Sequence, residues 1–337
     1  MLSPSFPRPD GPLGLSVVIP CYNEQPVMDA LIARVTPVCE SAFPGDFEIV
    51  LVNDGSSDRT WPLICSHAEA SPHVIGIDLS RNHGHQVALS AGLQVCRGDL
   101  VLVLDADLQD PPELLPKMLD KVREGYDVVY GQRVHRHGET LFKRAAAASF
   151  YRLLERMIDI SIPRDTGDFR LMTRRVVDQL NAMPERFRFI RGMVSWVGFR
   201  QTAIPYERDP RFAGESHYPL RRMLGLAIDA ITSFSTLPLR FASLLGMAFG
   251  LLGLVVLGWV LVAYFTDGTI AGWTSMLAIV LILGSVQLLI LGVFGEYLGR
   301  MYMETKRRPL FIIQEIRGLP ATQTTRTTAG QPEHAQG

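Results

Sequence analysis

The sequence predicts an α/β domain with a mostly parallel sheet, followed by a hairpin of two apolar helices long enough to cross a membrane. Apolar runs alternate with helical patterns through the first hundred residues, which is typical of a parallel sheet with helices on both faces. Residues 241–266 and 268–295 contain no charged side chain. At 337 residues, of which 47% are hydrophobic, the chain can form one large domain and a smaller part.

Polar residues follow each predicted strand of the first hundred residues. The expected strands cover residues 15–20, 47–52, 74–79 and 100–104, with helices at about 26–41 and 86–96. The residues that follow these strands can all form hydrogen bonds: Tyr22, Asn23, Glu24, Asp54, Asp58, Arg81, Asn82, Asp105 and Asp107. Ligands bind at the carboxyl ends of the strands in such sheets. We therefore predict a ligand site at this edge, although the glycine-rich motifs of dinucleotide and P-loop sites are absent.

Asp105 and Asp107 follow an apolar run and are spaced two apart. On an extended backbone such side chains point to the same side, and carboxylates are the ligands that Mg²⁺ prefers. The pattern predicts a divalent cation that holds a diphosphate, although acidic residues also end strands by chance. An aspartyl phosphohydrolase is a remote alternative, because that chemistry requires Thr or Val where Leu108 stands. His83 and His85 are interpreted as part of a polar loop and not as metal ligands.

Charge and cysteine content exclude several classes of protein. The formal net charge of -1 argues against nucleic acid as a partner. The four cysteines are scattered without a C-x-x-C pair, which indicates reduced thiols in a cytosolic setting. We expect no secretory signal before Leu15, and a disordered tail from about residue 321.

The two uncharged runs predict a membrane protein, because about 20 apolar residues in a helix span a bilayer. Two buried helices of a soluble core are the alternative. Basic residues flank the hairpin at Arg221, Arg222, Arg240, Arg300, Lys306, Arg307 and Arg308, and residues 267–272 contain none. The positive-inside rule then predicts a multi-pass protein of the inner (plasma) membrane with its catalytic domain and both termini in the cytoplasm. Residues 141–160 and 219–234 mix basic and apolar side chains, which favours amphipathic helices at the membrane interface.

Three segments carry a resemblance to a known family: 17–24, 52–58 and 104–109 are similar to family 2 glycosyltransferases with a GT-A fold. The resemblance is narrowed to polyprenyl-phosphate sugar transferases by residues 165–171, Arg200 and 295–300. Within these enzymes the bactoprenol glucosyltransferases are most similar. The dolichol-phosphate mannose synthases and the aminoarabinose transferase of lipid A modification are also similar. The resemblance covers residues 14–316. It implies a tail at 1–13, a catalytic domain at 14–218, a juxtamembrane amphipathic helix at 219–236, spans at 240–266 and 273–297, and a tail at 298–337.

The resemblance also implies roles for individual residues. Those implied to bind the nucleotide are Pro20, Tyr22, Glu24, Asp54 and Asp105. Those implied to hold Mg²⁺ or Mn²⁺ are Asp105, Asp107 and Gln109. Those implied to bind the acceptor phosphate or the diphosphate are Arg133, Arg170, Arg200 and Ser216, and the catalytic pair is Asp168 and Asp107. His217 departs from the family pattern, which usually has Lys there.

The implied reaction is transfer of a hexose, glucose in the most similar branch, from a UDP-sugar to undecaprenyl or another polyprenyl phosphate with inversion. Transfer from GDP-mannose and transfer of an amino sugar stay open as alternatives. The products would serve cell-envelope polysaccharide or lipid modification, and a homo-oligomer, a tetramer by kinship, is implied. Whether Asp168 acts as a base or only orients a reactant also stays open. A processive polysaccharide synthase would carry a Q-x-x-R-W segment, which this chain lacks.

Overall fold

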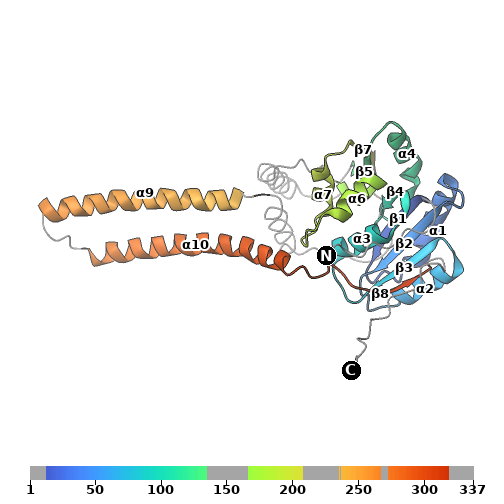
Figure 1. The fold of residues 1–337 in the computed structure, drawn as a ribbon, viewed down its shortest axis with the longest axis horizontal. Helices are drawn as coiled ribbons and strands as arrows, with labels where there is room; N and C mark the ends of the chain where they lie inside the picture. The colour runs from blue at the N-terminus through green and yellow to red at the C-terminus, as the bar shows by residue number, and fades with distance from the viewer. Residues whose placement is uncertain (1–12, 135–165, 208–234, 236, 267–271, 319–337) are drawn as a thin grey trace, which may run out of the picture.

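The computed structural model describes residues 13–134, 166–207, 235, 237–266 and 272–318, and consists of a sheet domain and two long helices (Figure 1). The strands are β1 (Leu13–Cys21), β2 (Phe47–Asn53), β3 (Val74–Leu79), β4 (Gly98–Val103), β5 (Val128–Arg133), β6 (Thr166–Thr173), β7 (Gln201–Tyr206) and β8 (Ile313–Arg317). The helices are α1 (Met28–Ala42), α2 (Thr60–Ala70), α3 (His85–Val95), η1 (Pro112–Leu114), α4 (Leu115–Arg123), α6 (Arg174–Ala182), α7 (Ile190–Val197), α9 (Leu237–Thr266) and α10 (Trp273–Thr305).

The strands form one eight-stranded sheet in the order β7-β5-β6-β4-β1-β2-β3-β8. β1 pairs in parallel with β2 and β4, β2 with β3, and β5 with β7, whereas β6 and β8 run antiparallel to their neighbours. The carboxyl ends of β1 to β5 and β7 therefore meet at one edge, and β6 begins there. The predicted α/β class with a mostly parallel sheet is confirmed.

Burial on both faces of the sheet explains the continuous apolar runs. In β1, Val17 and Ile19 contact the core on the α1, α2 and α4 face, and Val18 contacts the core on the α3, α6 and α7 face. Parallel strands covered on both sides lack the apolar and polar alternation of a one-sided sheet. All four cysteines are free thiols, three of them buried, as the sequence predicts.

The apolar runs form α9 and α10, which lie side by side and extend away from the sheet (Figure 1). Their most apolar parts, Leu237–Val256 and Ile282–Thr305, are long and apolar enough to cross a membrane and are 6% and 0% buried. At 33 residues, α10 is about 50 Å long, which exceeds the roughly 30 Å hydrocarbon core of a bilayer. The helix therefore continues about three turns beyond the uncharged run that ends at Gly295.

Residues 296–317, which we call the return segment, bring the chain back to the sheet. Within residues 298–337, which the sequence predicts as a tail, the structure has β8, which pairs antiparallel with β3 from Gly76↔Arg317 to Leu79↔Ile313. Ile313 and Ile316 pack against the core on the α3 face, and this burial holds the strand in place. The predicted amphipathic stretches, Ser216, His217, and the chain before residue 13 and after 318 lie outside the described residues.

Candidate active site

The loops after β1 and β2 are joined by hydrogen bonds at the predicted edge. The Asn23 amide donates to Ser56 Oγ at 3.0 Å, and the Glu24 amide donates to Thr60 Oγ1 at 2.9 Å. Asn23 adopts a left-handed φ of 56° in this tight turn. The turn leaves Tyr22 half exposed, whereas Pro20 is buried inside β1 opposite Val52. Tyr22, directly after β1, is therefore a side chain that a flat ligand at this edge can contact.

Asp54 fixes the loop that follows β3. Its carboxylate is buried and accepts hydrogen bonds from the backbone amides of His83 at 2.7 Å and Gly84 at 2.9 Å. Gly55, at a φ of 64°, allows close approach, because a Cβ there would lie 2.5 Å from the Asn82 nitrogen. Both oxygens of Asp54 bind the protein itself, so its clearest role is to shape the loop that precedes α3.

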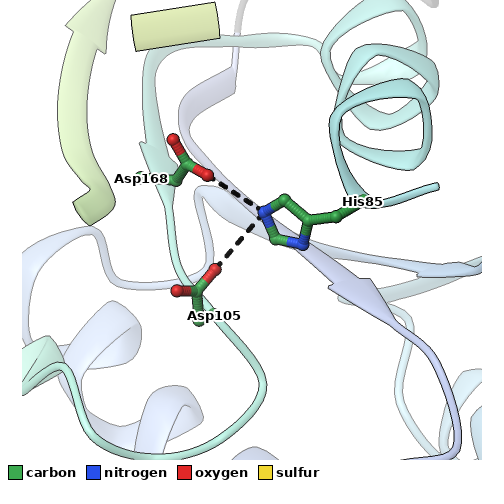
Figure 2. A group of neighbouring side chains, drawn as sticks. All are labelled: His85, Asp105 and Asp168. Carbon is green, nitrogen blue, oxygen red and sulfur yellow. Dashed lines mark hydrogen bonds and ion pairs between the residues drawn. The ribbon is translucent and has the colours of Figure 1, made fainter. Parts of the chain in front are cut away.

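Asp168, at the start of β6, lies at the centre of a charged cluster. Its Oδ2 accepts a hydrogen bond from His85 Nε2 at 3.1 Å (Figure 2). The same oxygen accepts a hydrogen bond from Gln86 Nε2 at 2.9 Å. Its Oδ1 lies 3.0 Å from Arg191 Nε and 3.6 Å from Arg170 Nη2. Burial alone raises the pKa of this carboxyl, but Arg191, His85 and Arg170 outweigh burial and hold the pKa well below its usual range. Asp168 is therefore a fixed anion and a very weak base.

Asp105 faces the same histidine from the end of β4, with its Oδ1 3.6 Å from His85 Nε2 (Figure 2). Burial, followed by the negative charge of Asp168, raises its pKa to about 6. Its buried Oδ1 accepts no hydrogen bond from the residues that the structure describes. A buried carboxylate oxygen without a donor, beside other carboxylates, fits a divalent cation.

Two sets of residues near Asp105 could hold such a cation. The predicted set adds Asp107 and Gln109 from the loop after β4, where the Gln109 amide donates to Asp107 Oδ1 at 3.2 Å. In the second set, ligand atoms of His85, Asp105 and Asp168 lie within 4.8 Å of one another. Both oxygens of Asp168 already bind cationic or amide groups, which makes this carboxylate less suited to take up an ion. Asp105 belongs to both sets.

Arg133 ends β5 at the same edge. Its Nε donates a hydrogen bond to the Tyr206 hydroxyl at 3.2 Å, and its Nη2 lies 3.6 Å from Asp110 Oδ1. The Tyr206 hydroxyl in turn donates a hydrogen bond to Asp110 Oδ1. A Cβ at Gly167 would lie 2.7 Å from Arg133 Nη2, so glycine leaves room for the guanidinium. Arg133 thus brings a partly exposed cation to the edge near Asp168.

The other two described arginines of the prediction differ in their positions. Arg170 is buried beside Asp168, and burial lowers its pKa to about 10, so it balances the charge of Asp168 inside the protein. Arg200 precedes β7, where its carbonyl accepts the Asp127 amide at 2.8 Å and its guanidinium lies 4.8 Å from the centre of the Tyr126 ring. Because β7 is parallel to β5, this is the opposite edge of the sheet. The prediction that Arg200 binds phosphate at the site is therefore wrong.

Three residues of the cluster were missed from the sequence. His85 was interpreted as part of a polar loop, and Gln86 and Arg191 were not selected. Gln86 connects two elements, since its Nε2 donates to Asp168 and its Oε1 accepts the Ile190 amide at 2.9 Å. The signal in the sequence was the position of His85 in the loop between the predicted strand at 74–79 and the predicted helix at about 86–96.

Comparison with known proteins places these features in context. Residues 16–180 match the family model described as glycosyl transferase family 2. An uncharacterized glycosyltransferase of Bacillus subtilis, YkcC, is 49% identical over 305 residues, which cover 90% of this chain and 94% of the relative. The bactoprenol glucosyl transferase of Shigella phage SfX is 38% identical, with coverage of 89% and 98%. A prophage bactoprenol glucosyl transferase homolog of Escherichia coli is 36% identical, with coverage of 90% and 99%.

Proposed function

This chain belongs to glycosyl transferase family 2, and we propose that it transfers a hexose from a nucleotide sugar to a polyprenyl phosphate. Membership of the family makes the protein a transferase. The donor, the acceptor and the need for a metal are the proposed part. Glucose and undecaprenyl phosphate are favoured by the relatives that are named bactoprenol glucosyl transferases.

The state of Asp168 is the observation that carries this proposal. A sugar hydroxyl acceptor would need a general base, and an aspartate whose pKa is held well below its usual range by Arg191, His85 and Arg170 is a poor one. A phosphate monoester has a second pKa near 6, so it is already anionic at neutral pH. The site thus suits an acceptor that arrives ionised, and Asp168 orients a reactant without accepting its proton.

The edge of the sheet offers groups for each part of the donor. Tyr22 would contact the base, and Glu24 and the loop shaped by Asp54 would line the ribose. Asp105, Asp107 and Gln109 would hold a Mg²⁺ or Mn²⁺ ion, which supplies positive charge to the departing diphosphate when bound. Asp168 would lie beside the sugar, where its fixed charge and that of Arg191 hold the reacting groups in place.

The acceptor would approach from the side of Arg133, whose guanidinium can donate two hydrogen bonds to a phosphate. Attack on the anomeric carbon opposite the departing diphosphate would invert an α-linked donor to a β-linked lipid product. This attack would bring the anionic acceptor phosphate close to the anionic diphosphate. Arg133 and the cation would both reduce the repulsion between them.

Membrane attachment through α9 and α10 would bring the acceptor to the site. Both helices are almost wholly unburied and apolar, which favours two spans over a buried core. We propose that the sheet domain and both termini lie on the cytoplasmic side, because the flanking residues are basic and residues 267–272 contain no Lys or Arg.

Lipid-product analysis tests this function. Purified full-length protein is incubated with undecaprenyl phosphate and one donor in each reaction: UDP-glucose, GDP-mannose or a UDP-N-acetylhexosamine. The mass of the lipid product is then measured by mass spectrometry. We expect a hexosyl lipid with UDP-glucose, its loss with a chelator, and its loss in Asp107→Asn. Asp120→Asn, an exposed carboxylate paired with Arg123 on α4, is the matched control. Absence of lipid product with every donor would contradict the proposal. Full turnover in excess chelator would contradict the proposed need for a metal.

A further inference from the structure

The last turns of α10 contact the loop between α6 and α7. Glu304 Oε1 accepts a hydrogen bond from the Arg186 amide at 2.8 Å. The Arg300 guanidinium lies 4.5 Å from the centre of the Phe187 ring, and Arg186 Nη1 donates to the Arg308 carbonyl at 2.9 Å. A hydrogen bond to a carboxylate is roughly twice as strong as a neutral one. The return segment thus holds this loop at consecutive residues.

The same loop is fixed on its other side by α6. Arg188 donates to the carbonyls of Leu180 at 2.6 Å and Met183 at 2.9 Å, at the carboxyl end of α6. These carbonyls belong to a helix end, where the last four lack a partner within the helix. The loop therefore has contacts to α6 and α10 within three residues and has little freedom to move separately from either.

The loop leads directly into the residues that bind Asp168. The Ile190 amide donates to Gln86 Oε1, and Arg191 Nε lies 3.0 Å from Asp168 Oδ1. Arg191 follows Arg186 by five positions and lies in the first turn of α7. A displacement of the loop would therefore move the cation that keeps Asp168 ionised.

The return segment also contacts the chain just before the loop that carries His85. Its Ile312 carbonyl accepts the Ser80 amide at 3.0 Å, directly before the loop that carries His85. β8 then continues along β3. The return segment thus contacts the loop that leads into Arg191 and the end of β3, from which the chain leads to His85.

We propose that Glu304 is a positioning residue of the active site, which holds α7 so that Arg191 stays on Asp168. The inference rests on the proposed function for its catalytic readout. It means that the end of the membrane helix is part of the machinery, and that the catalytic domain is competent only when α10 is in place. Glu304 touches no reactant and acts through the Arg186 amide.

Kinetics of two variants at one position test this role. In Glu304→Ala the Arg186 amide loses its acceptor, and we expect kcat to fall about tenfold with the donor KM within about twofold. Glu304→Gln keeps an oxygen acceptor, so we expect most of kcat to return. Glu315→Ala, which removes a carboxylate paired with Arg317 in the same return segment, is the matched control and should retain activity. Equal kcat in Glu304→Ala and wild type, or no recovery in Glu304→Gln, would overturn the proposal.

A double-mutant cycle and hydrogen exchange separate positioning from general destabilisation. If Glu304 acts through Arg191, the losses of Glu304→Ala and Arg191→Gln are not additive, whereas independent effects add. In Glu304→Ala the amides of Arg186 and the first turn of α7 should exchange at least about tenfold faster while those of β1 are unchanged. Faster exchange throughout the sheet, or additive losses, would refute the role. The exchange measurement does not require an active enzyme. If the wild-type protein showed no transfer, the proposed function would be rejected, and the exchange rates would still test whether Glu304 holds α7.

Discussion

The pKa of Asp105 leads to a quantitative prediction about metal binding. Burial and the charge of Asp168 raise this pKa to about 6, so the carboxyl is half protonated near pH 6 in protein stripped of divalent cations. A cation binds the ionised form, so binding below pH 6 must release one proton. We expect the apparent affinity for Mn²⁺ to fall about tenfold for each pH unit below 6 and to be nearly constant above 7.

Stability of the stripped protein should show the opposite trend over the same interval. Because the folded pKa of Asp105 is raised, its contribution to stability is fully present below about pH 4 and is lost as pH rises through 6. The change from 3.8 to about 6 corresponds to at most about 3 kcal/mol. Asp168 acts in a separate interval, since its depressed pKa adds stability above about pH 4 that is lost on further acidification.

Calorimetric titration with Mn²⁺ and thermal melts from pH 4 to 7 measure both effects. Asp105→Asn should remove the loss of stability between pH 4 and 6 and should weaken Mn²⁺ binding at every pH. Asp120→Asn, remote from the site, should leave both curves unchanged. An Mn²⁺ affinity that does not vary between pH 5 and 7 would refute the reasoning, because the proton and the cation would then not compete for one carboxylate.

Four substitutions test the remaining parts of the site. Arg191→Gln removes a cation 3.0 Å from Asp168 and should lower kcat about 10- to 100-fold in steady-state assays. Asp54→Ala leaves the partly buried amides of His83 and Gly84 unpaired, and melts should show a loss of about 2–4 kcal/mol. Arg133→Ala should raise the acceptor KM about tenfold, and an unchanged KM would remove it from the acceptor site. Arg200→Ala should change neither kcat nor KM and should cost about 0.5–1 kcal/mol of stability through its lost contact with an aromatic ring.

Sequence reasoning succeeded where chain order and spatial order coincide. The strands at 15–20, 47–52, 74–79 and 100–104 were each placed within a few residues, because strands buried on both faces read as continuous apolar runs. Since the carboxyl ends of parallel strands share an edge, the convergence of Asp54 and Asp105 at that edge followed from local patterns alone. The two long apolar helices could likewise be predicted from the two uncharged runs of the sequence.

It failed where a contact depends on the order of strands or on distant parts of the chain. Arg191 lies 23 residues from Asp168, and nothing in its own helix distinguishes it from an ordinary surface arginine. Arg200 was misplaced because it directly precedes β7, and the direction of β7 decides at which edge of the sheet Arg200 lies. The sequence around Arg200 does not reveal that direction. β8 was missed since five residues of mixed polarity after a long apolar helix resemble a linker until β3 provides a partner.

The two carboxylates that face His85 obtain their negative charge in different ways. Asp168 is ionised by cations that belong to the fold, Arg191 and Arg170, and therefore stays charged whether or not a donor is bound. Asp105 lies 3.6 Å from His85 Nε2, but burial and the charge of Asp168 still raise its pKa to about 6, so a cation from outside would complete its ionisation. If that cation arrives with the donor diphosphate, full ionisation of the pair coincides with donor binding, so electrostatic attraction at the site is greatest when the leaving group is present. An acceptor phosphate that reached Arg133 earlier would meet a site only partly organised for transfer.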